Sequence, residues 1–591
     1  VLEAIQDRVL WLSTRMIDYA NADRPNIDGI KVGGHQASSA SMVSILAALY
    51  FDFLDSEDRI SIKPHASPVF HSIQYLLGNL DQDYLKKLRE AGGLQSYPSR
   101  TKDPDTVDFS TGSVGLGAVA PLFAAVTRQY VDSHFGPRPK SRFISVIGDA
   151  ELDEGNIWEA LADPVTTNLG NVMWIVDFNR QSLDRVIPGV RIAQWRAQFE
   201  AAGWHVKEVK YGSKLNKVFE DSDSQKFKVW FDQIPNEQYQ SLFGLTPEAA
   251  RIRFLEGSPD GVSKFLEKYN NEELFEILTD LGGHDISSLL EAFKDCDQVE
   301  NKPSVVFAYT IKGWHLPIAG DKRNHSAQIS KKQISEIREL SGLTEANEWS
   351  KFEPGSPEDS LCLSRAQSLK RASSKSEIFA DFPHTTGIAP TGSSSSQEAF
   401  GRVLTEVSRN EAIRPYLVTT APDVATSTNL GGFINRHGIF NKDVKREWND
   451  NSIQKWVESP NGQHIELGIS EMNLFTLLGQ LGISGDISDQ PLIPIGTVYD
   501  PFVLRGLDAF IYSVYSGAKF IVAGTPSGIT LAPEGGAHQS TITPSVGVEL
   551  PGVVLMEPAY AQSLDWLLCD ALAHVAGAKK NTAPDLRPNE L

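Results

Sequence analysis

Two polar side chains, Asp149 and Asn179, each follow a short apolar run typical of a buried parallel strand. The runs cover residues 143–147 and 171–178, and a helical pattern lies between them. Open α/β sheets bind ligands at the carboxyl ends of their strands. A carboxylate and an amide at that edge suit a hard divalent ion, such as Mg²⁺, that also holds phosphate oxygens. The alternative for this segment alone is an ordinary β-α-β unit with polar loop residues.

Glycine- and serine-rich loops precede this unit, and several carry residues able to bind or transfer protons. His35, His65 and Tyr97 lie in such loops, and residues 108–117 form another. Small residues ahead of a helix leave backbone N–H groups free to meet an anion. Downstream, a strand-like run over 303–309 leads to Lys312, and the loop 319–326 contains His325. His35 considered alone also fits a structural histidine with satisfied hydrogen bonds.

A second group of candidate residues lies in the carboxyl-terminal third of the chain. Glu471 opens an apolar helical pattern, which places a carboxylate at a helix start. A strand-like run over 491–498 leads to Tyr499 and Phe502, and a glycine-rich loop contains His538. The alternative for Glu471 is an ordinary acidic residue that the helix dipole favours at this position.

The 591-residue chain is too long for one hydrophobic core. Apolar runs alternate with helical patterns, which predicts an α/β fold with mostly parallel, doubly wound sheets. Residues 353–397 are rich in Ser, Pro and Thr and are predicted to be a linker without packed elements. We therefore expect one domain over 1–352 and another over 398–591.

Composition narrows the function classes. The formal net charge of −20 argues against general nucleic-acid binding and against attraction to an anionic membrane. No apolar run approaches membrane-spanning length. Three widely separated cysteines suit a reducing compartment. We expect a cytoplasmic protein without nucleic-acid or membrane partners, and the missing initiator Met suggests a piece of a longer chain.

The order of the loops resembles that of a known family. GGHQAS, PHASP, GLQSYP, STGSVGLG, GDAELDE and FNRQSLD follow one another as in the homodimeric E1 component of the 2-oxo acid (pyruvate) dehydrogenase complex. More distantly, the chain is similar to transketolase, and the resemblance runs from near residue 30 to near 560. Ala150 and Phe178 depart from the thiamine diphosphate signature, which has Gly and Asn there. The resemblance implies two thiamine diphosphate-binding-fold domains, diphosphate-binding and pyrimidine-binding, and a third, carboxyl-terminal domain that is missing here.

The resemblance also implies roles for individual residues. Mg²⁺ would bind Asp149, Asn179 and the Gln181 carbonyl, with N–H groups near Ala150 and Glu151 on the diphosphate. Ile469 and Leu183 would bend the cofactor, and Glu471 would protonate its pyrimidine beside the aromatic wall of Tyr499 and Phe502. The implied cofactor contacts also include Ser38, His65, Ser113 and Gly148. Substrate binding and proton transfer would fall to His35, His65, Tyr97, Lys312, His325 and His538.

The implied function is thiamine diphosphate-dependent decarboxylation of a 2-oxo acid, pyruvate above all. The acyl group would pass to a lipoyl group of a dihydrolipoyl acyltransferase (E2) partner, and the enzyme would be a homodimer. Val424, where the E1 family tends to have Glu, and the GGAHQS loop are closer to transketolase. Glycolaldehyde transfer between sugar phosphates is therefore one alternative. A truncated, non-catalytic relative is another, because of Ala150, Phe178 and the missing domain.

Overall fold

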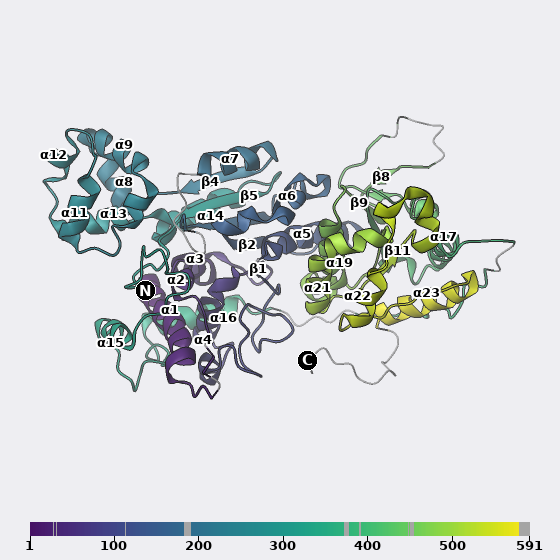
Figure 1. The fold of residues 1–591 in the computed structure, drawn as a ribbon, viewed down its shortest axis with the longest axis horizontal. Coiled ribbons are helices and arrows are strands. Elements are labelled where there is room, and N and C mark those ends of the chain that lie inside the picture. Colours follow the sequence, from purple (N-terminus) through teal and green to yellow (C-terminus); the bar gives the residue numbers. More distant parts are fainter. Residues whose placement is uncertain are drawn as a thin grey trace. The chain divides into compact units, whose positions relative to one another are not determined.

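The computed structural model divides into two compact units, each with its own sheet (Figure 1). Unit 1 comprises Val1–Ala118, Ser141–Glu154 and Gly170–Arg371, and unit 2 comprises Val119–Lys140, Gly155–Leu169 and Ala372–Leu591. The structure describes all residues except 28, 31, 113, 182–190, 372–376, 389–391, 447, 449–453 and 578–591, and the side chains of 529 and 530.

The sheet of unit 1 has five parallel strands in the order β1-β2-β3-β5-β4. Their bounds are β1 Arg59–Ser61, β2 Phe143–Gly148, β3 Val172–Phe178, β4 His205–Val209 and β5 Ser304–Tyr309. The central strands β2, β3 and β5 are buried along their whole length, as expected for a sheet covered on both faces. The predicted strands over 143–147 and 171–178 are thereby confirmed.

Helices cover both faces of this sheet (Figure 1). On one face, Met173 and Ile175 of β3 join the core formed with α1 Leu2–Asp18, α3 Val43–Ala48, α4 Ser67–Leu76 and α14 Ile286–Asp297. On the other face, Trp174 of the same strand contacts Phe199 of α7 Ile192–Ala201. Alternate side chains of a strand point to opposite faces, so one apolar run serves two cores.

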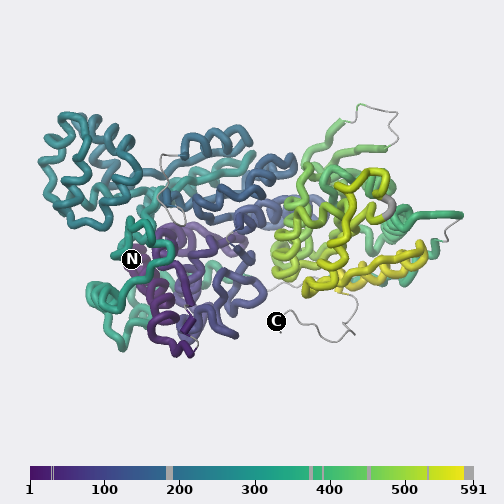
Figure 2. Tube along the Cα trace, viewed as in Figure 1, coloured from purple at the N-terminus to yellow at the C-terminus, as the bar shows by residue number. Residues whose placement is uncertain are grey.

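A group of short helices lies between β4 and α14 in sequence and is seen as one cluster in Figure 2. Its members are α8 Ser213–Phe219, α9 Gln225–Gln233, α10 Asn236–Gln240, α11 Pro247–Leu255, α12 Val262–Leu266 and α13 Asn271–Thr279. Phe227, Phe231 and Phe254 are buried against one another. Aromatic packing of this kind gives short helices the tertiary support that their length alone cannot provide.

Unit 2 contains a six-stranded parallel sheet in the order β11-β10-β6-β9-β7-β8. The strands are β6 Leu417–Pro422, β7 Ile439–Phe440, β8 Glu458–Ser459, β9 His464–Leu467, β10 Ile493–Val498 and β11 Ile521–Gly524. Ile493 and Ile495 of β10 join the core with α17 Ser396–Val407 and α23 Ala561–Val575. Gly496 lies against Leu478 of α19 Glu471–Gly482 on the opposite face. The α/β class with helices on both faces is confirmed.

The helix that follows Asp149 in sequence belongs to unit 2. This helix, α6 Gly155–Ala162, contacts α19, and the longer α5 Leu116–Phe135 also lies largely in unit 2. The sequence pattern extends the helix toward Gly170, but α6 ends at Ala162. Asp163 accepts a hydrogen bond from the Val165 N–H and starts a 3₁₀ turn instead. A proline one residue after Asp163 cannot continue an α-helix.

The prediction that residues 353–397 lack packed elements was wrong for part of this stretch. A helix, α16, spans Pro357–Ser368. Ser356 caps it by accepting from the Asp359 N–H, and proline occupies its first turn. Arg365 donates to the Tyr50 carbonyl at 2.9 Å, and Cys362 is buried. Serine-rich composition hid a helix whose stability comes from unit 1.

Within the described residues, no helix is both long and apolar enough to cross a membrane.

A buried ion pair in unit 1 predicts a pH-dependent stability. His71 Nδ1 lies 2.8 Å from Asp105 Oδ2, with both side chains fully buried. Burial alone would lower the pKa of His71, but the Asp105 carboxylate outweighs it and raises that pKa above 6.5. The pair's contribution is therefore complete below pH 6.5, the unfolded value, and is lost as pH rises through the folded pKa.

We expect His71→Gln to destabilise the protein by about 1–3 kcal/mol below pH 6.5 and by less at higher pH, where the wild-type pair is weakened. Urea unfolding across this range measures the difference. His574→Gln, at an exposed position of α23, serves as the matched control. A constant difference between His71→Gln and wild type at every pH would contradict the assignment.

Candidate functional site

The predicted metal-binding residues lie at the carboxyl edge of neighbouring strands in unit 1. Asp149 follows β2, and Asn179 follows β3. Asp149 Oδ2 accepts from the Arg180 N–H at 2.7 Å, and Asn179 Oδ1 accepts from the Gln181 N–H at 3.0 Å. Arg180 has a φ of +62°. This left-handed residue turns the loop after β3 so that its own N–H meets the Asp149 carboxylate, which links the loop of Asn179 to the end of β2.

The electrostatics of this edge favour a cation. Burial, and then the Asp177 carboxylate, raise the pKa of Asp149 to about 7. Burial also raises the pKa of Glu151 to about 7, although its Oε2 accepts from the Gly148 N–H at 2.8 Å. The other carboxylate oxygen of Glu151 is buried without a hydrogen-bond partner. Two carboxyl groups whose ionised forms are disfavoured by burial lie at this edge with an amide oxygen, and a divalent ion would stabilise that ionised donor set.

A buried network below this edge was missed by sequence reasoning. Asp177 of β3 forms an ion pair with Lys63 and accepts hydrogen bonds from Ser41, at 2.7 Å, and Thr310. Lys63 holds the pKa of Asp177 below its usual range, although burial opposes this. Asp177 lies inside an apolar run. A charged residue within a buried strand needs a partner, and this was the one sequence feature that could have indicated the network. The network also anchors Asn179, whose amide donates to Asp177 at 3.2 Å.

Gln181 connects the loop after β3 to the loop that carries His325. Its side-chain oxygen accepts from Asn324 Nδ2 at 2.9 Å, and its amide donates to Gln240 at 3.1 Å. Asn324 Nδ2 also lies 3.3 Å from the Lys312 carbonyl, and the side chain is buried. The side chain of Gln181 is therefore used in positioning, which is compatible with its backbone carbonyl acting as a metal ligand.

Asn324→Ala should release the loop 319–326 while leaving the sheet intact. The substitution removes the bond to Gln181 and leaves that buried oxygen without its partner, at a cost of about 1–3 kcal/mol. We expect faster amide exchange in 319–326, measured by mass spectrometry, and unchanged exchange in β2 and β3. Asn347→Ala, in another loop of unit 1, is the control. Unchanged protection of 319–326 would show that other contacts hold it.

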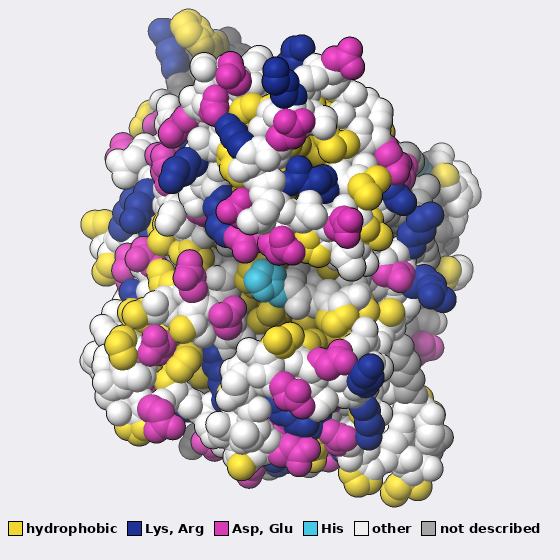
Figure 3. Space-filling model, turned by 90° about the vertical axis from the view of Figure 1, so that its left-hand side faces the viewer, with side chains coloured by type: hydrophobic (Ala, Val, Ile, Leu, Met, Phe, Trp, Pro, Cys, Tyr) yellow, Lys and Arg dark blue, Asp and Glu magenta, His cyan; other side chains and the backbone are white. Residues whose placement is uncertain are grey.

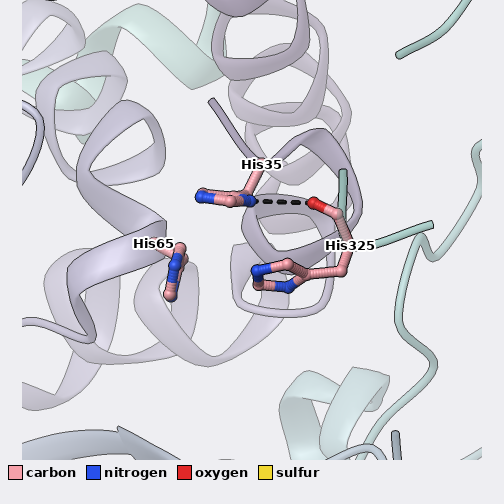
Figure 4. Close-up of side chains that lie close together, drawn as sticks. All are labelled: His35, His65 and His325. Carbon is pink, nitrogen blue, oxygen red and sulfur yellow. Dashed lines mark hydrogen bonds between the residues drawn. The ribbon is translucent and has the colours of Figure 1, made fainter. Parts of the chain in front are cut away.

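Three of the predicted histidines meet at one point in unit 1 (Figure 4). The ring centroids of His35 and His65 are 4.1 Å apart, and His325 lies 4.3 Å from His35 and 5.2 Å from His65. The His35 Nδ1–H donates to the His325 carbonyl at 2.8 Å, since a carbonyl oxygen can only accept. Lys312 Nζ lies 3.4 Å from His325 Nδ1. The ring centroids of Tyr97 and His65 are 5.7 Å apart.

Burial makes these imidazoles poor bases. It lowers the pKa of His35, lowers that of His65 to about 2 and lowers that of His325 to about 3. Neighbouring charges add to the effect, with Lys63 and Lys312 contributing at all three rings. The rings are therefore neutral hydrogen-bonding groups at neutral pH, and the positive charge of the cluster comes from lysine.

The other predicted residues of unit 1 are placed as follows. Ser38 is buried in the short helix α2 Gln36–Ala40, directly after His35. Phe178, which stands where the signature has Asn, is buried 4.7 Å from Tyr309 and 5.9 Å from Trp195. Its side chain serves the core on the α7 face. Ser113 and Leu183 lie outside the described residues.

In unit 2, Glu471 begins α19, as the sequence predicts. Ser470 caps the helix by accepting from the Asn473 N–H at 3.1 Å, and donates to Glu159 of α6. Asn473 in turn donates to Asp163 at 3.0 Å. The Glu471 carboxylate is buried and accepts from Arg505 Nε at 2.9 Å, a contact that the sequence did not indicate. The start of α19 is thus held by Glu159 and Asp163 through Ser470 and Asn473, and by Arg505 through Glu471.

Aromatic residues gather near this helix start. The rings of Tyr499 and Phe502 are nearly parallel with centroids 6.1 Å apart, and His538 packs 5.5 Å from Phe502. Phe502 belongs to the 3₁₀ segment Asp500–Gly506, which also supplies Arg505. Ile469, two residues before Glu471, is 79% exposed, so its side chain is accessible to a ligand.

The face shown in Figure 3 has acidic and basic side chains interspersed, with a histidine in a hollow.

Two families match the chain in succession. The family described as transketolase, thiamine diphosphate binding domain, matches residues 31–228, and the family described as pyruvate dehydrogenase E1 component middle domain matches residues 378–586. The chain belongs to the thiamine diphosphate-dependent E1 family. Curated relatives agree: the pyruvate dehydrogenase E1 components of Escherichia coli K12 and Pseudomonas aeruginosa are each 24% identical, over 93% and 95% of this chain.

This E1-family chain spans 66% of the length of each of those two relatives, just under two thirds. Among solved structures, transketolases from Leishmania mexicana and Campylobacter jejuni each give a TM-score of 0.68 at 17% identity. Each match covers 97% of this chain, and 75% and 76% of the two transketolases. These similarities confirm the two-sheet fold that the loop motifs imply.

Proposed function

We propose that this chain is the thiamine diphosphate-binding part of an enzyme that decarboxylates a 2-oxo acid, with pyruvate as the first candidate. The observation that carries the proposal is the match of residues 378–586 to the E1 middle domain, downstream of the thiamine diphosphate binding domain matched over 31–228. Relatives over nearly the whole chain are named pyruvate dehydrogenase E1 component.

The donor set in unit 1 fits the cofactor's anionic end. Asp149, Asn179 and the Gln181 carbonyl would hold Mg²⁺, and the backbone from Gly148 through Ala150 to Glu151 would approach the diphosphate. The raised pKa of Asp149 supports this, because an ion at the site removes the penalty of ionising that buried carboxyl group. Ser38 and His65 complete the proposed contacts among described residues, while Ser113 and Leu183 stay predictions.

Unit 2 supplies the groups for the cofactor's ring system. Glu471 would hold a proton at the pyrimidine N1′, with Tyr499 and Phe502 as a flat apolar wall and Ile469 against the bent cofactor. When bound, thiamine diphosphate supplies the electron sink for decarboxylation. The Ser470 cap fixes the start of α19, and Arg505 holds the Glu471 carboxylate, so the proton of Glu471 would be presented at a defined position.

The histidine cluster supports binding of a small carboxylate. His35, His65 and His325 offer neutral imidazoles, Lys312 supplies charge, and Tyr97 adds a hydroxyl group beside His65. These residues, with His538 from unit 2, would bind the substrate carboxylate or move protons during acyl transfer. We further propose a homodimer, a lipoyl-bearing acyltransferase as acyl acceptor, and a cytoplasmic location.

The test uses the full-length protein that contains this chain, with Mg²⁺ and thiamine diphosphate. We expect CO₂ release from pyruvate or 2-oxobutyrate with an artificial electron acceptor, which makes the readout independent of any E2 partner. Saturable cofactor binding without CO₂ release from either acid would refute the substrate assignment. Absence of cofactor binding would instead favour a non-catalytic relative.

Transketolase chemistry is the second candidate. Val424, two residues after β6, and the GGAHQS loop favour it, and the similar solved structures are transketolases. Sugar phosphate donors and acceptors, supplied to the same protein, decide between the two. Product formation from sugar phosphates without CO₂ release from 2-oxo acids would support transketolase chemistry.

A further inference from the structure

His35, His65 and His325 come from three separate segments and converge on one point (Figure 4). His35 precedes α2, His65 lies in the 3₁₀ turn Pro64–Ala66, and His325 lies in the loop after Lys312. One nitrogen from each ring lies within 4.8 Å of the other two. We propose that these three imidazoles form a binding site for a borderline transition-metal ion, such as Zn²⁺ or Co²⁺, separate from the oxygen-ligand site at Asp149.

The hydrogen bond of His35 prepares it for this role. Its Nδ1–H donates to the His325 carbonyl at 2.8 Å, which leaves the lone pair on Nε2. Metal-binding histidines commonly fix their tautomer by such a bond to a backbone carbonyl. The same bond ties the ring of one ligand to the backbone of another. Closure of the three rings around an ion therefore needs little rearrangement of the chain.

The spacing is close to that of a tetrahedral site. Two nitrogen ligands of a zinc ion lie about 3.4 Å apart when each Zn–N bond is about 2.1 Å. The nitrogens of the three rings lie up to 4.8 Å apart and have to approach one another by up to about 1.4 Å, which rotations of the side chains provide. Three histidines leave a fourth position for water or an anion.

The donor types separate this site from the magnesium site. Imidazole nitrogens suit Zn²⁺, Co²⁺ and Ni²⁺, whereas Mg²⁺ prefers carboxylate, carbonyl and water oxygens. One feature opposes any cation: Lys312 Nζ is 3.4 Å from His325 Nδ1, and Lys63 also acts on the cluster. The ion therefore has to overcome like-charge repulsion, and removing the Lys312 charge should tighten binding.

The direct experiment is titration of the intact chain with Co²⁺ in the presence of saturating Mg²⁺, followed by visible absorption. We expect a single ion with the intense bands of four-coordinate cobalt. His65→Ala and His325→Ala should each weaken binding at least about tenfold, equivalent to about 1.4 kcal/mol. Lys312→Met should strengthen it severalfold, an effect that general loss of structure would not produce. His574→Asn, at an exposed histidine, should bind as wild type does.

Thermal unfolding of each variant confirms that it is folded. Absence of four-coordinate bands in the wild type would overturn the proposal. Equal affinity in wild type, His65→Ala and His325→Ala would also overturn it, because the ion would then lie elsewhere. Mg²⁺-dependent thiamine diphosphate binding, measured on the same samples, tests the proposed function separately. If both hold, Zn²⁺ should inhibit turnover by occupying groups proposed to bind substrate, and this last step rests on the proposed function.

Discussion

Glu471→Gln is expected to reduce CO₂ release by about a hundredfold or more, since general acid–base groups contribute about 10²–10⁴ in rate. The substitution keeps the size of the side chain and an oxygen that can accept from Arg505 Nε. It removes the carboxyl proton that we propose for the cofactor's pyrimidine ring. Decarboxylation with an artificial electron acceptor measures the loss, and tryptophan fluorescence follows Mg²⁺-dependent cofactor binding on the same sample.

Glu549→Gln is the matched control, because Glu549 is an exposed acidic residue at the end of α22 Thr543–Glu549 in the same unit. It should retain wild-type activity. Glu471→Gln should bind cofactor within a few-fold of wild type, so the loss will lie in the rate. Activity within threefold of wild type would remove Glu471 from the mechanism and leave it as a helix-start acid stabilised by the dipole.

Residues at strand ends and helix starts could be predicted because their signals are local. The apolar run before Asp149 forms β2, the run before Asn179 forms β3, and Glu471 begins α19. Each depends on a pattern of a few residues followed by a polar one. Opposite faces of β3 serve different cores because of the two-residue period of a strand, and its continuous apolar run fits burial on both faces.

Partners across long sequence separations could not be predicted. The ion pair joins Asp177 of β3 to Lys63, which lies just after β1, and Asp177 looks like an interruption in an apolar run. Arg505 reaches Glu471 from a later 3₁₀ segment. Asn324, in a polar loop with no periodicity, is buried by its bond to Gln181. Such contacts depend on how elements pack, and no window of neighbouring residues encodes them.

The helix α16 is a packed element that the sequence analysis predicted to be a linker. Its serines and its flanking prolines are typical of a linker, yet Ser356 and Pro357 are also a favourable cap and first turn. Composition alone does not separate these possibilities. Arg365 donates to the carbonyls of Tyr50 and Leu54 in unit 1, and these contacts hold the segment as a packed helix.

The second large effect is expected for Asp149→Asn. This substitution should raise the thermal midpoint in the absence of Mg²⁺ and lower it relative to wild type when Mg²⁺ and the cofactor are bound. Burial raises the pKa of this carboxyl group to about 7, so without a metal ion its ionised form is a cost to the fold at pH 8. Asp149→Asn replaces it with a neutral amide of nearly equal size. In EDTA at pH 8 we therefore expect a higher thermal midpoint than wild type.

With saturating Mg²⁺ and thiamine diphosphate the order should invert. Ligand at a hundred times its Kd stabilises wild type by about 2.7 kcal/mol, whereas the variant lacks the charged metal ligand and should bind at least about a hundredfold more weakly. Asp153→Asn, at an exposed residue of the same 3₁₀ turn Asp149–Asp153, controls for the chemical change and should follow wild type in both buffers. Equal stabilisation of Asp149→Asn and wild type by Mg²⁺ and cofactor would place the metal elsewhere. A thermal midpoint of Asp149→Asn in EDTA that is no higher than that of wild type would show that neighbouring groups already stabilise the ionised carboxylate. A buried carboxylate without such support lowers the stability of the fold.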